Sequence, residues 1–305
     1  MLLAFFIFMI ILVLYVHIQD QYKKCEDLEV YEMDYSTREQ LNEVCAMKQP
    51  VLFAMPLEED VIKVHYDDAS VEIPVWDIRE YAVRDSVEPI WLSYHSFHSL
   101  AKSDPKGHFF TRKNGKYVDI EGKEVLDDLL RPALTGYSDI ECLNGSTGAW
   151  IPLQYHLDDR TFFFVTKGKI SVRMTPWRSR RFLSPVADYE NYEFFSKLNP
   201  WTSTEKEIRW IDFEVVAGHV LSIPAWWWYS IRFSSVETEV VGVRYLTFGN
   251  ILAHVPDWIR YYIQFHATQR ISMKPLDTTS HPTTSHLETS EETLEETSLD
   301  SHPSL

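Results

Sequence analysis

An uninterrupted apolar run opens the chain, and residues 1–16 contain no charged side chain. As a helix, about 18 residues would span roughly 27 Å, close to the thickness of the hydrocarbon core of a bilayer. We therefore expect residues 1–19 to form a single-pass transmembrane anchor that contacts the lipid bilayer through Met1–Ile18. A cleaved signal peptide is the alternative, although the run has neither a basic leading segment nor a small-residue cleavage site.

Basic residues flank this run on one side. Lys23 and Lys24 follow it and none precedes it, so the positive-inside rule predicts that the body lies on the cytoplasmic side of the membrane. Residues 20–35 are predicted to be a short charged linker.

Helical and alternating patterns then succeed one another through the first half of the body. Residues 37–47 carry apolar positions at helical spacing after the capping-box pattern Ser36-x-x-Glu39. Further along, strands are predicted at residues 51–55, 61–66 and 70–75, helical segments at 90–100 and 124–130, and a hairpin turn at Asn114-Gly115.

The strongest β pattern lies in the second half. Residues 162–165 and 170–174 are two strand candidates joined by a turn. Residues 218–231 predict a strand, a corner at Pro224 and a second strand, with Trp226-Trp227-Trp228 at the corner. After a closing β-rich run at 239–248, Asp257 is placed to cap a helix with Ile259, Tyr262, Ile263 and His266 on one side. The chain thus predicts a mainly β domain with helices (α+β) in residues 36–275.

The composition changes beyond residue 275. Residues 276–305 are rich in Ser, Thr and Glu, and they contain no Lys or Arg. Such a segment cannot bury enough apolar surface to order itself, so we predict a disordered acidic tail. The formal net charge of −16 and the lack of a basic patch argue against a nucleic-acid partner.

The candidate chemistry begins with His156-Leu157-Asp158. In a strand or at a strand end, residues i and i+2 point the same way, so His156 and Asp158 are placed to bring an imidazole and a carboxylate to one metal ion. A second His from a distant strand would complete the two-His-one-carboxylate triad of non-haem iron oxygenases.

A set of short motifs accompanies this pair: Lys48-Gln49-Pro50-Val51-Leu52-Phe53, Pro152-Leu153, Phe162 to Phe164, Gly168-Lys169 and Gly218-x-Val220-Leu221-x-Ile223-Pro224-x-x-Trp227-Trp228. Together the motifs resemble the cupin-like JmjC family, the group that includes the asparaginyl hydroxylase of hypoxia-inducible factor. The resemblance covers residues 28–248. It implies a double-stranded β-helix, the cupin or jelly-roll barrel, and in many members Fe(II) and 2-oxoglutarate as cofactors. It also implies a C-terminal helix that packs on the barrel or forms a homodimer.

Two departures from that family bear on the predicted site. Tyr229 stands where the family places its second metal-binding His, and a phenol gives up its proton only near pH 10, so it is a poor ligand for Fe(II). Ile170 stands where the family has a lysine for 2-oxoglutarate. By the resemblance, the candidate metal ligands are His156, Asp158 and Tyr229, and the candidate cofactor-binding residues are Lys169 and Arg173.

The first ligand pair allows two alignments. Matching Gly168 to the turn glycine of the family puts His156 and Asp158 close to the metal positions, and we favour this alignment. Matching Pro152-Leu153 instead puts Gln154 and His156 at those positions, which removes the metal-binding motif.

The departures favour a membrane-anchored, cupin-like protein with a degenerate Fe(II)/2-oxoglutarate site that binds or scaffolds rather than catalyses. Its predicted pocket is lined by Trp226, Trp228 and Ile170 beside His156 and Tyr229, and it would hold a small ligand or a protein partner. An active Fe(II)/2-oxoglutarate-dependent hydroxylase or demethylase is one alternative. A purely structural membrane or virion component is the other, and a filled interior would favour it.

Overall fold

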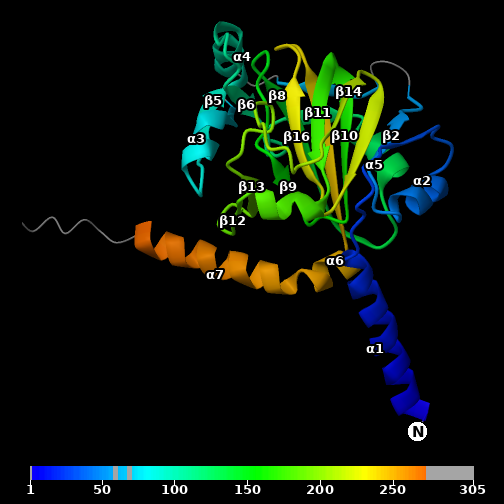
Figure 1. Ribbon diagram of the computed structural model, residues 1–305. Helices are drawn as coiled ribbons and strands as arrows, with labels where there is room; N and C mark the ends of the chain where they lie inside the picture. The colour runs from blue at the N-terminus through cyan, green and yellow to red at the C-terminus, as the bar shows by residue number, and fades with distance from the viewer. Residues whose placement is uncertain (1, 58–60, 67–70, 273–305) are drawn as a thin grey trace, which may run out of the picture.

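The computed structural model describes residues 2–57, 61–66 and 71–272, with side chains through residue 267. An apolar helix projects from one end of a body built mainly from β-strands (Figure 1). Within the described residues the body has a nine-stranded sheet, a six-stranded sheet and a two-stranded ribbon. The prediction of a mainly β fold with helices is therefore confirmed.

The larger sheet contains β1 (Tyr31–Met33), β2 (Val51–Ala54), β4 (Glu72–Asp77), β5 (Ile90–Ser93), β6 (Phe109–Thr111), β8 (Thr135–Gly145), β10 (Arg160–Lys167), β15 (His219–Pro224) and β17 (Glu239–Thr247). Their spatial order is β1-β2-β15-β10-β17-β8-β6-β4-β5. The β1–β2 pair is parallel, and the β10, β15 and β17 pairs at the centre are antiparallel.

The smaller sheet contains β9 (Gln154–Tyr155), β11 (Lys169–Thr175), β12 (Pro185–Asp188), β13 (Glu193–Ser196), β14 (Ile211–Val216) and β16 (Trp228–Phe233), in the order β12-β13-β9-β16-β11-β14. Consecutive strands cross between the sheets, since β10 and β15 belong to the larger sheet and β11 and β16 to the smaller. Among the described strands no pairing joins the two sheets, so they face each other without closing into a barrel. The ribbon pairs β3 (Lys63–His65) with β7 (Asp119–Glu121).

Alternate residues of the central strands fill two separate cores. In β10, Phe163 and Val165 pack between the two sheets, whereas Phe162 and Phe164 pack on the opposite face of the larger sheet. That outer face is covered by α2 (Arg38–Cys45), α4 (Tyr94–Ser103) and α5 (Lys123–Leu130). The remaining helical elements are α1 (Leu2–Gln21), α3 (Ile78–Val83), the 3₁₀ helix η1 (Trp177–Phe182), α6 (Phe248–Ala253) and α7 (Val255–Ser272).

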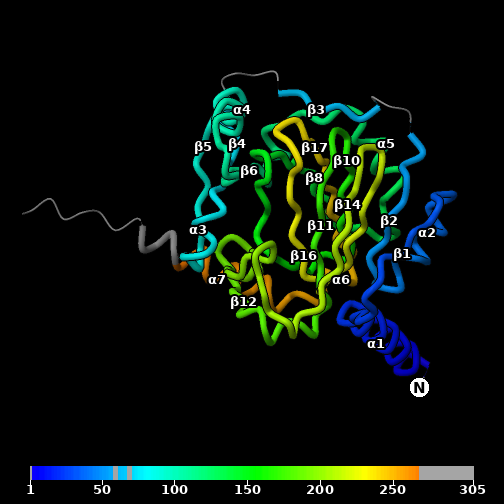
Figure 2. Tube along the Cα trace, turned by 45° about the horizontal axis from the view of Figure 1, so that its top comes forward, coloured from blue at the N-terminus to red at the C-terminus, as the bar shows by residue number. Residues whose placement is uncertain are grey.

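The helix α1 is long and apolar enough to cross a membrane, with a mean hydropathy of 2.5 over its most apolar window. Its C-terminal end packs against α6, where Gln21 Oε1 accepts a hydrogen bond from Asn250 Nδ2 at 3.2 Å. The C-terminal end of α1 is therefore bound to the body through α6. Both views show α1 and α7 at the same end of the body (Figures 1 and 2).

Several predicted boundaries need correction. The cap of α2 is Thr37, whose hydroxyl accepts from Gln40 N at 3.2 Å, one residue after the predicted Ser36. The hairpin predicted at Asn114-Gly115 is wrong, because β6 and β7 on either side belong to different sheets. The side chain of Asn114 instead donates to the carbonyl of Cys142 at 2.7 Å. The predicted tail, residues 276–305, lies outside the described residues.

Candidate functional site

The interior between the sheets changes from apolar to polar along the strands of the larger sheet. On β8 the inward side of the strand runs from Leu143 through Glu141 to Asp139, and on β17 it runs from Val240 to Arg244. Glu141 pairs with Gly242 and Asp139 pairs with Arg244 across the two strands. The interior thus has an apolar end, around Leu143, Val165, Ile170, Phe233 and Val240, and a polar end around Arg244.

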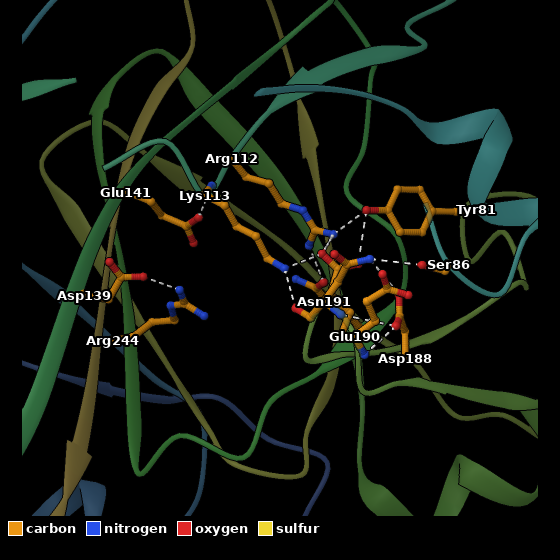
Figure 3. A network of polar contacts seen from close by, with 12 residues as sticks. Tyr81, Ser86, Arg112, Lys113, Asp139, Glu141, Asp188, Glu190, Asn191 and Arg244 are labelled. Atoms are coloured by element: carbon orange, nitrogen blue, oxygen red, sulfur yellow. Dashed lines mark hydrogen bonds and ion pairs between the residues drawn. The ribbon is translucent and has the colours of Figure 1, made fainter. Parts of the chain in front are cut away.

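A small cavity lies at the polar end. Its volume is about 60 Å³, counted as the space open to the centre of a water molecule, so it has room for water molecules. Charged and polar side chains dominate its lining: Arg112, Lys113, Glu141, Gln154, His156, Asp158, Glu193, Tyr229 and Arg244. Figure 3 shows Arg112 and Lys113 on one side of this region and Arg244 on the other.

The buried carboxylate of Glu193 organises one side of the cavity. It accepts from Arg112 Nη2 at 2.9 Å, lies 2.5 Å from Lys113 Nζ and accepts from the hydroxyl of Tyr81 at 3.2 Å. Burial alone would raise the pKa of Glu193, but the two neighbouring cations hold it below its ordinary value. Glu193 is therefore ionised and fully engaged with protein groups.

The amide of Gln154 extends this network to Tyr229. Gln154 Oε1 accepts from Arg112 Nη1 at 2.5 Å, and Gln154 Nε2 donates to the hydroxyl of Tyr229 at 3.0 Å. The strands explain this contact, because Gln154 of β9 and Tyr229 of β16 are direct cross-strand partners. Burial, followed by the charge of Glu141, raises the pKa of Tyr229, so its phenol stays protonated near neutral pH.

Arg244 occupies the other side of the cavity. Its Nη2 is hydrogen-bonded to Asp139 and its Nη1 lies 3.9 Å from Asp158 Oδ2. Burial opposes its charge, yet Glu141, Asp158 and Asp139 keep the pKa of Arg244 above the ordinary value. The cavity wall is thus built from fixed charges of both signs.

His156 is the neutral group in this charged wall. Burial lowers the pKa of His156 to about 4, although the carboxylate of Asp158 acts in the opposite direction. Its Nδ1 lies 3.4 Å from the hydroxyl of Thr161. Its Nε2 is buried and has no hydrogen-bond partner among the described residues.

The structure brings together all three predicted metal ligands, yet it engages them differently from a metal centre. His156, Asp158 and Tyr229 all line the cavity, but Asp158 lies against Arg244 and Tyr229 bonds Gln154. The His156–Asp158 pair directly follows β9, which ends at Tyr155. In the described part of the chain, no group of three or more His, Cys, Asp and Glu side chains could hold a metal ion.

The same geometry bears on the two alignments. The side chains of Gln154, His156 and Tyr229 meet at the cavity, with the rings of His156 and Tyr229 5.7 Å apart. These are the positions that the alignment on Pro152-Leu153 assigns to the metal site. Asp158 lines the same cavity, so both alignments place their predicted residues there.

The predicted cofactor-binding residues lie elsewhere. Lys169 Nζ pairs with the exposed carboxylate of Glu214 at 2.9 Å. Arg173 donates to Asp212 at 2.8 Å and to the carbonyl of Pro200 at 2.5 Å. Both cations therefore bond β14 or the loop before it, and neither lines the cavity.

The three tryptophans do not form a shared pocket wall. Trp226 has a positive φ of 70° and points to the end of α1, where its ring nitrogen donates to the Gln21 carbonyl at 3.1 Å. Trp227 packs between the sheets, and Trp228 packs in a third core with Leu153 and other apolar residues. Trp226 contacts the end of α1, Trp228 packs in the third core and Ile170 packs at the apolar end of the interior, so none of the three lines the cavity.

Sequence reasoning missed most of the charged lining: Arg112, Lys113, Glu141, Glu193 and Arg244. The sequence did contain one signal of a polar interior. Arg244 is a charged residue within the otherwise apolar segment Val240–Leu246, and it lies on the same face of the strand as Gly242. An isolated cation on a strand of this kind is buried and needs partners. The acidic partners of Arg244 lie on β8, and Glu193 lies on β13. These segments are far apart in the sequence, and only the sheet topology brings them together.

Comparisons with known proteins do not extend the sequence-based resemblance. No protein-family model matches this chain. No curated protein matches it significantly.

Proposed function

We propose that this protein is a single-pass membrane protein whose body binds a small oxyanion, such as a carboxylate group, in the cavity at the polar end. The proposal retains the hypothesis of a degenerate cupin-like protein that binds rather than catalyses, with its body on the cytoplasmic side. The two facing sheets are then an opened form of the double-stranded β-helix.

The observation that carries the proposal is a surplus of hydrogen-bond donors around the cavity. Glu193 is already bonded to Arg112 and Lys113, and Glu141 accepts from the Lys113 backbone N–H at 2.6 Å. In contrast, Arg112 Nε and Arg244 Nε are buried and bond no group among the described residues. Buried donors without acceptors are costly, and a ligand oxygen that accepts from them removes this cost.

The size of the cavity limits the ligand. Its small volume, about 60 Å³, suits a compact anion such as acetate, glycolate or phosphate better than a dicarboxylate as long as 2-oxoglutarate. A charged ligand group here also gains from the two arginines, since hydrogen bonds between ions are shorter and stronger than neutral ones.

The residues present do not fit an Fe(II) centre. His156 is the single imidazole in the cavity lining, and Asp158 is held by Arg244. Tyr229 keeps its proton and serves as an acceptor for Gln154. An iron ion would require these contacts to be broken, so we derive no reaction step through iron or 2-oxoglutarate.

The test is calorimetric titration of the detergent-solubilised full chain with acetate, glycolate and phosphate as probes. We expect at least one probe to bind, and Arg244→Gln to weaken it by about tenfold or more because a charge-assisted hydrogen bond is lost. Lys169→Gln is the matched control, since it removes a cation that lies outside the cavity, and it should bind as the wild type does.

Two outcomes would overturn the proposal. If no probe binds and Arg244→Gln folds normally by circular dichroism, the polar end is structural. If Mn(II), titrated without oxygen, binds tightly only with 2-oxoglutarate and His156→Ala abolishes this binding, the oxygenase alternative is correct instead. Arg244→Lys keeps the charge without the Nε donor and replaces Arg244→Gln if the latter does not fold.

A further inference from the structure

An exposed apolar stripe runs along α6 and α7 at the end of the body from which α1 emerges. Its members recur at helical spacing: Phe248, Leu252, Val255, Ile259, Tyr262 and Ile263. Tyr262 and Ile263 are each 62% exposed. The other side of α7 packs on the body, where the ring of Trp258 stacks on Tyr192 with centroids 4.7 Å apart. The stripe therefore faces away from the body.

The length of α1 determines the level of this stripe relative to a bilayer that α1 spans. The helix covers Leu2–Gln21, and 20 residues at 1.5 Å each give about 30 Å, the thickness of the hydrocarbon core. If α1 spans the bilayer, Gln21 lies at the boundary between acyl chains and headgroups. Gln21 bonds Asn250 of α6 and Trp226, so α6 is held at that level.

The contacts at this junction are numerous enough to fix α6 to α1. The hydroxyl of Tyr22 donates to the carbonyl of Ala253 at 2.5 Å. Beside Gly249, an added Cβ would lie 4.0 Å from His17 Cβ, so the two helices approach closely there. Figure 1 shows α7 leaving this junction sideways, across the direction of α1. A helix in that position lies along the membrane surface when α1 crosses the membrane.

Basic side chains border the same junction. Lys24 Nζ lies 4.5 Å from the ring centroids of both Trp177 and Trp226, which places η1 next to the end of α1. The exposed cations here are Lys23, Lys24, Arg178, Arg180 and Arg181. They form a basic rim on a chain of net charge −16. Anionic lipid headgroups attract such juxtamembrane clusters.

We infer that α6 and α7 form a membrane-surface contact, with the apolar stripe inserted among the lipids of an anionic leaflet and the basic rim at the headgroups. Amphipathic helices bind bilayers in this way, with the apolar face buried at the headgroup boundary. The inference rests on the proposed membrane anchoring by α1. It makes the anchor one of two contacts, so that the body is held in one orientation at the surface.

The test uses the full chain in nanodiscs of phosphatidylcholine and phosphatidylserine, with single nitroxide labels in a Cys25→Ser background. Cys45 and Cys142 are buried and can remain. Labels at Leu12→Cys, Ile263→Cys and Val216→Cys report α1, the stripe and the opposite end of the sheets. Collision with oxygen measures contact with lipid, and collision with a water-soluble nickel complex measures contact with water.

We expect the labels at positions 12 and 263 to collide with oxygen and to be shielded from nickel, with the label at 216 showing the reverse. If position 12 is shielded and position 263 is open to nickel, the membrane-surface contact is wrong while the anchor stands. If position 12 is open to nickel, the anchoring itself is wrong. Dipolar broadening between labels at 263 would show that a second copy covers the stripe, which also overturns the inference.

The basic rim provides an independent check. Nanodiscs of phosphatidylcholine alone, or the double variant Arg180→Gln/Arg181→Gln in anionic discs, should increase collisions of nickel with the label at position 263. The matched double variant Lys167→Gln/Lys169→Gln removes two cations near the opposite end of the sheets and should leave those collisions unchanged. An equal response of both variants would contradict a role for the rim.

Discussion

The apolar and polar ends of the interior are formed by the same strands, yet their side chains have different roles. At the apolar end, side chains such as Phe233 and Val172 pack without polar partners and hold the two sheets together. At the polar end, Arg112 pairs with Glu193 and Arg244 pairs with Asp139, and a cavity lies between the two pairs. Packing alone explains the apolar end, whereas the polar end retains unpaired hydrogen-bond donors and a space for a ligand.

The apolar end should contribute most to stability. Phe233 is buried between the sheets, and Gly145 leaves room for its ring, since an added Cβ would lie 2.6 Å from Phe233 Cδ2. We expect Phe233→Ala to lower the free energy of unfolding by about 3–5 kcal/mol. Urea denaturation measures this change, and a loss below 1 kcal/mol would show that the sheets are not packed on one another here.

Breaking one charge pair at the polar end should cost somewhat less. Arg112→Met leaves Glu193 buried with Lys113 as its single cation, and we expect a loss of roughly 3 kcal/mol. The double variant Arg112→Met/Glu193→Met removes both charges, and it should recover at least half of that loss. Additive losses in the double variant would mean that the network stabilises the fold directly rather than shaping the cavity.

Acid should weaken the polar end through His156. Its pKa is about 4 in the folded protein and about 6.5 in an unfolded chain, so between these values the unfolded state binds the extra proton. The free energy of unfolding should therefore fall as the pH decreases from 6.5 towards 4, with this residue contributing at most about 1.4 kcal/mol per pH unit. His156→Gln should remove that contribution, and an unchanged pH slope in the variant would contradict it.

The smallest effect is expected outside the interior. Lys169→Ala removes an exposed ion pair with Glu214, and such pairs contribute about 0–1 kcal/mol. Stability should change by less than about 0.5 kcal/mol, and probe binding in the cavity should not change at all. A strong loss of binding would return Lys169 to the role that the family resemblance implies.

The contrast between the two ends also explains what the sequence could predict. Strands at 162–165 and 170–174 were predictable because the first is an uninterrupted apolar run, the second alternates apolar and polar residues, and a glycine marks the turn between them. The polar end was not, because Arg112, Glu193 and Arg244 are ordinary charged residues in sequence, and only β-sheet pairing places them together. The sequence placed His156 and Asp158 close together, but it could not show that Asp158 lies against Arg244 or that Tyr229 bonds Gln154.

The tryptophan run shows the same limit in another form. Three adjacent indoles predicted a pocket wall, but the corner at Trp226 and the alternation of β16 send them to three separate places. The stripe of Ile259, Tyr262 and Ile263 was visible as a helical pattern. Its exposure is a property of the folded chain, in which these side chains are 53–62% exposed.

The most direct test of the polar end is anomalous diffraction from crystals of the full chain soaked separately with bromide and with Mn(II). The oxyanion-binding account predicts a bromide peak in the cavity within contact of Arg244 and Arg112, and no manganese peak beside His156. A manganese peak coordinated by His156 and Asp158, with no bromide in the cavity, would contradict the account and restore the metal centre.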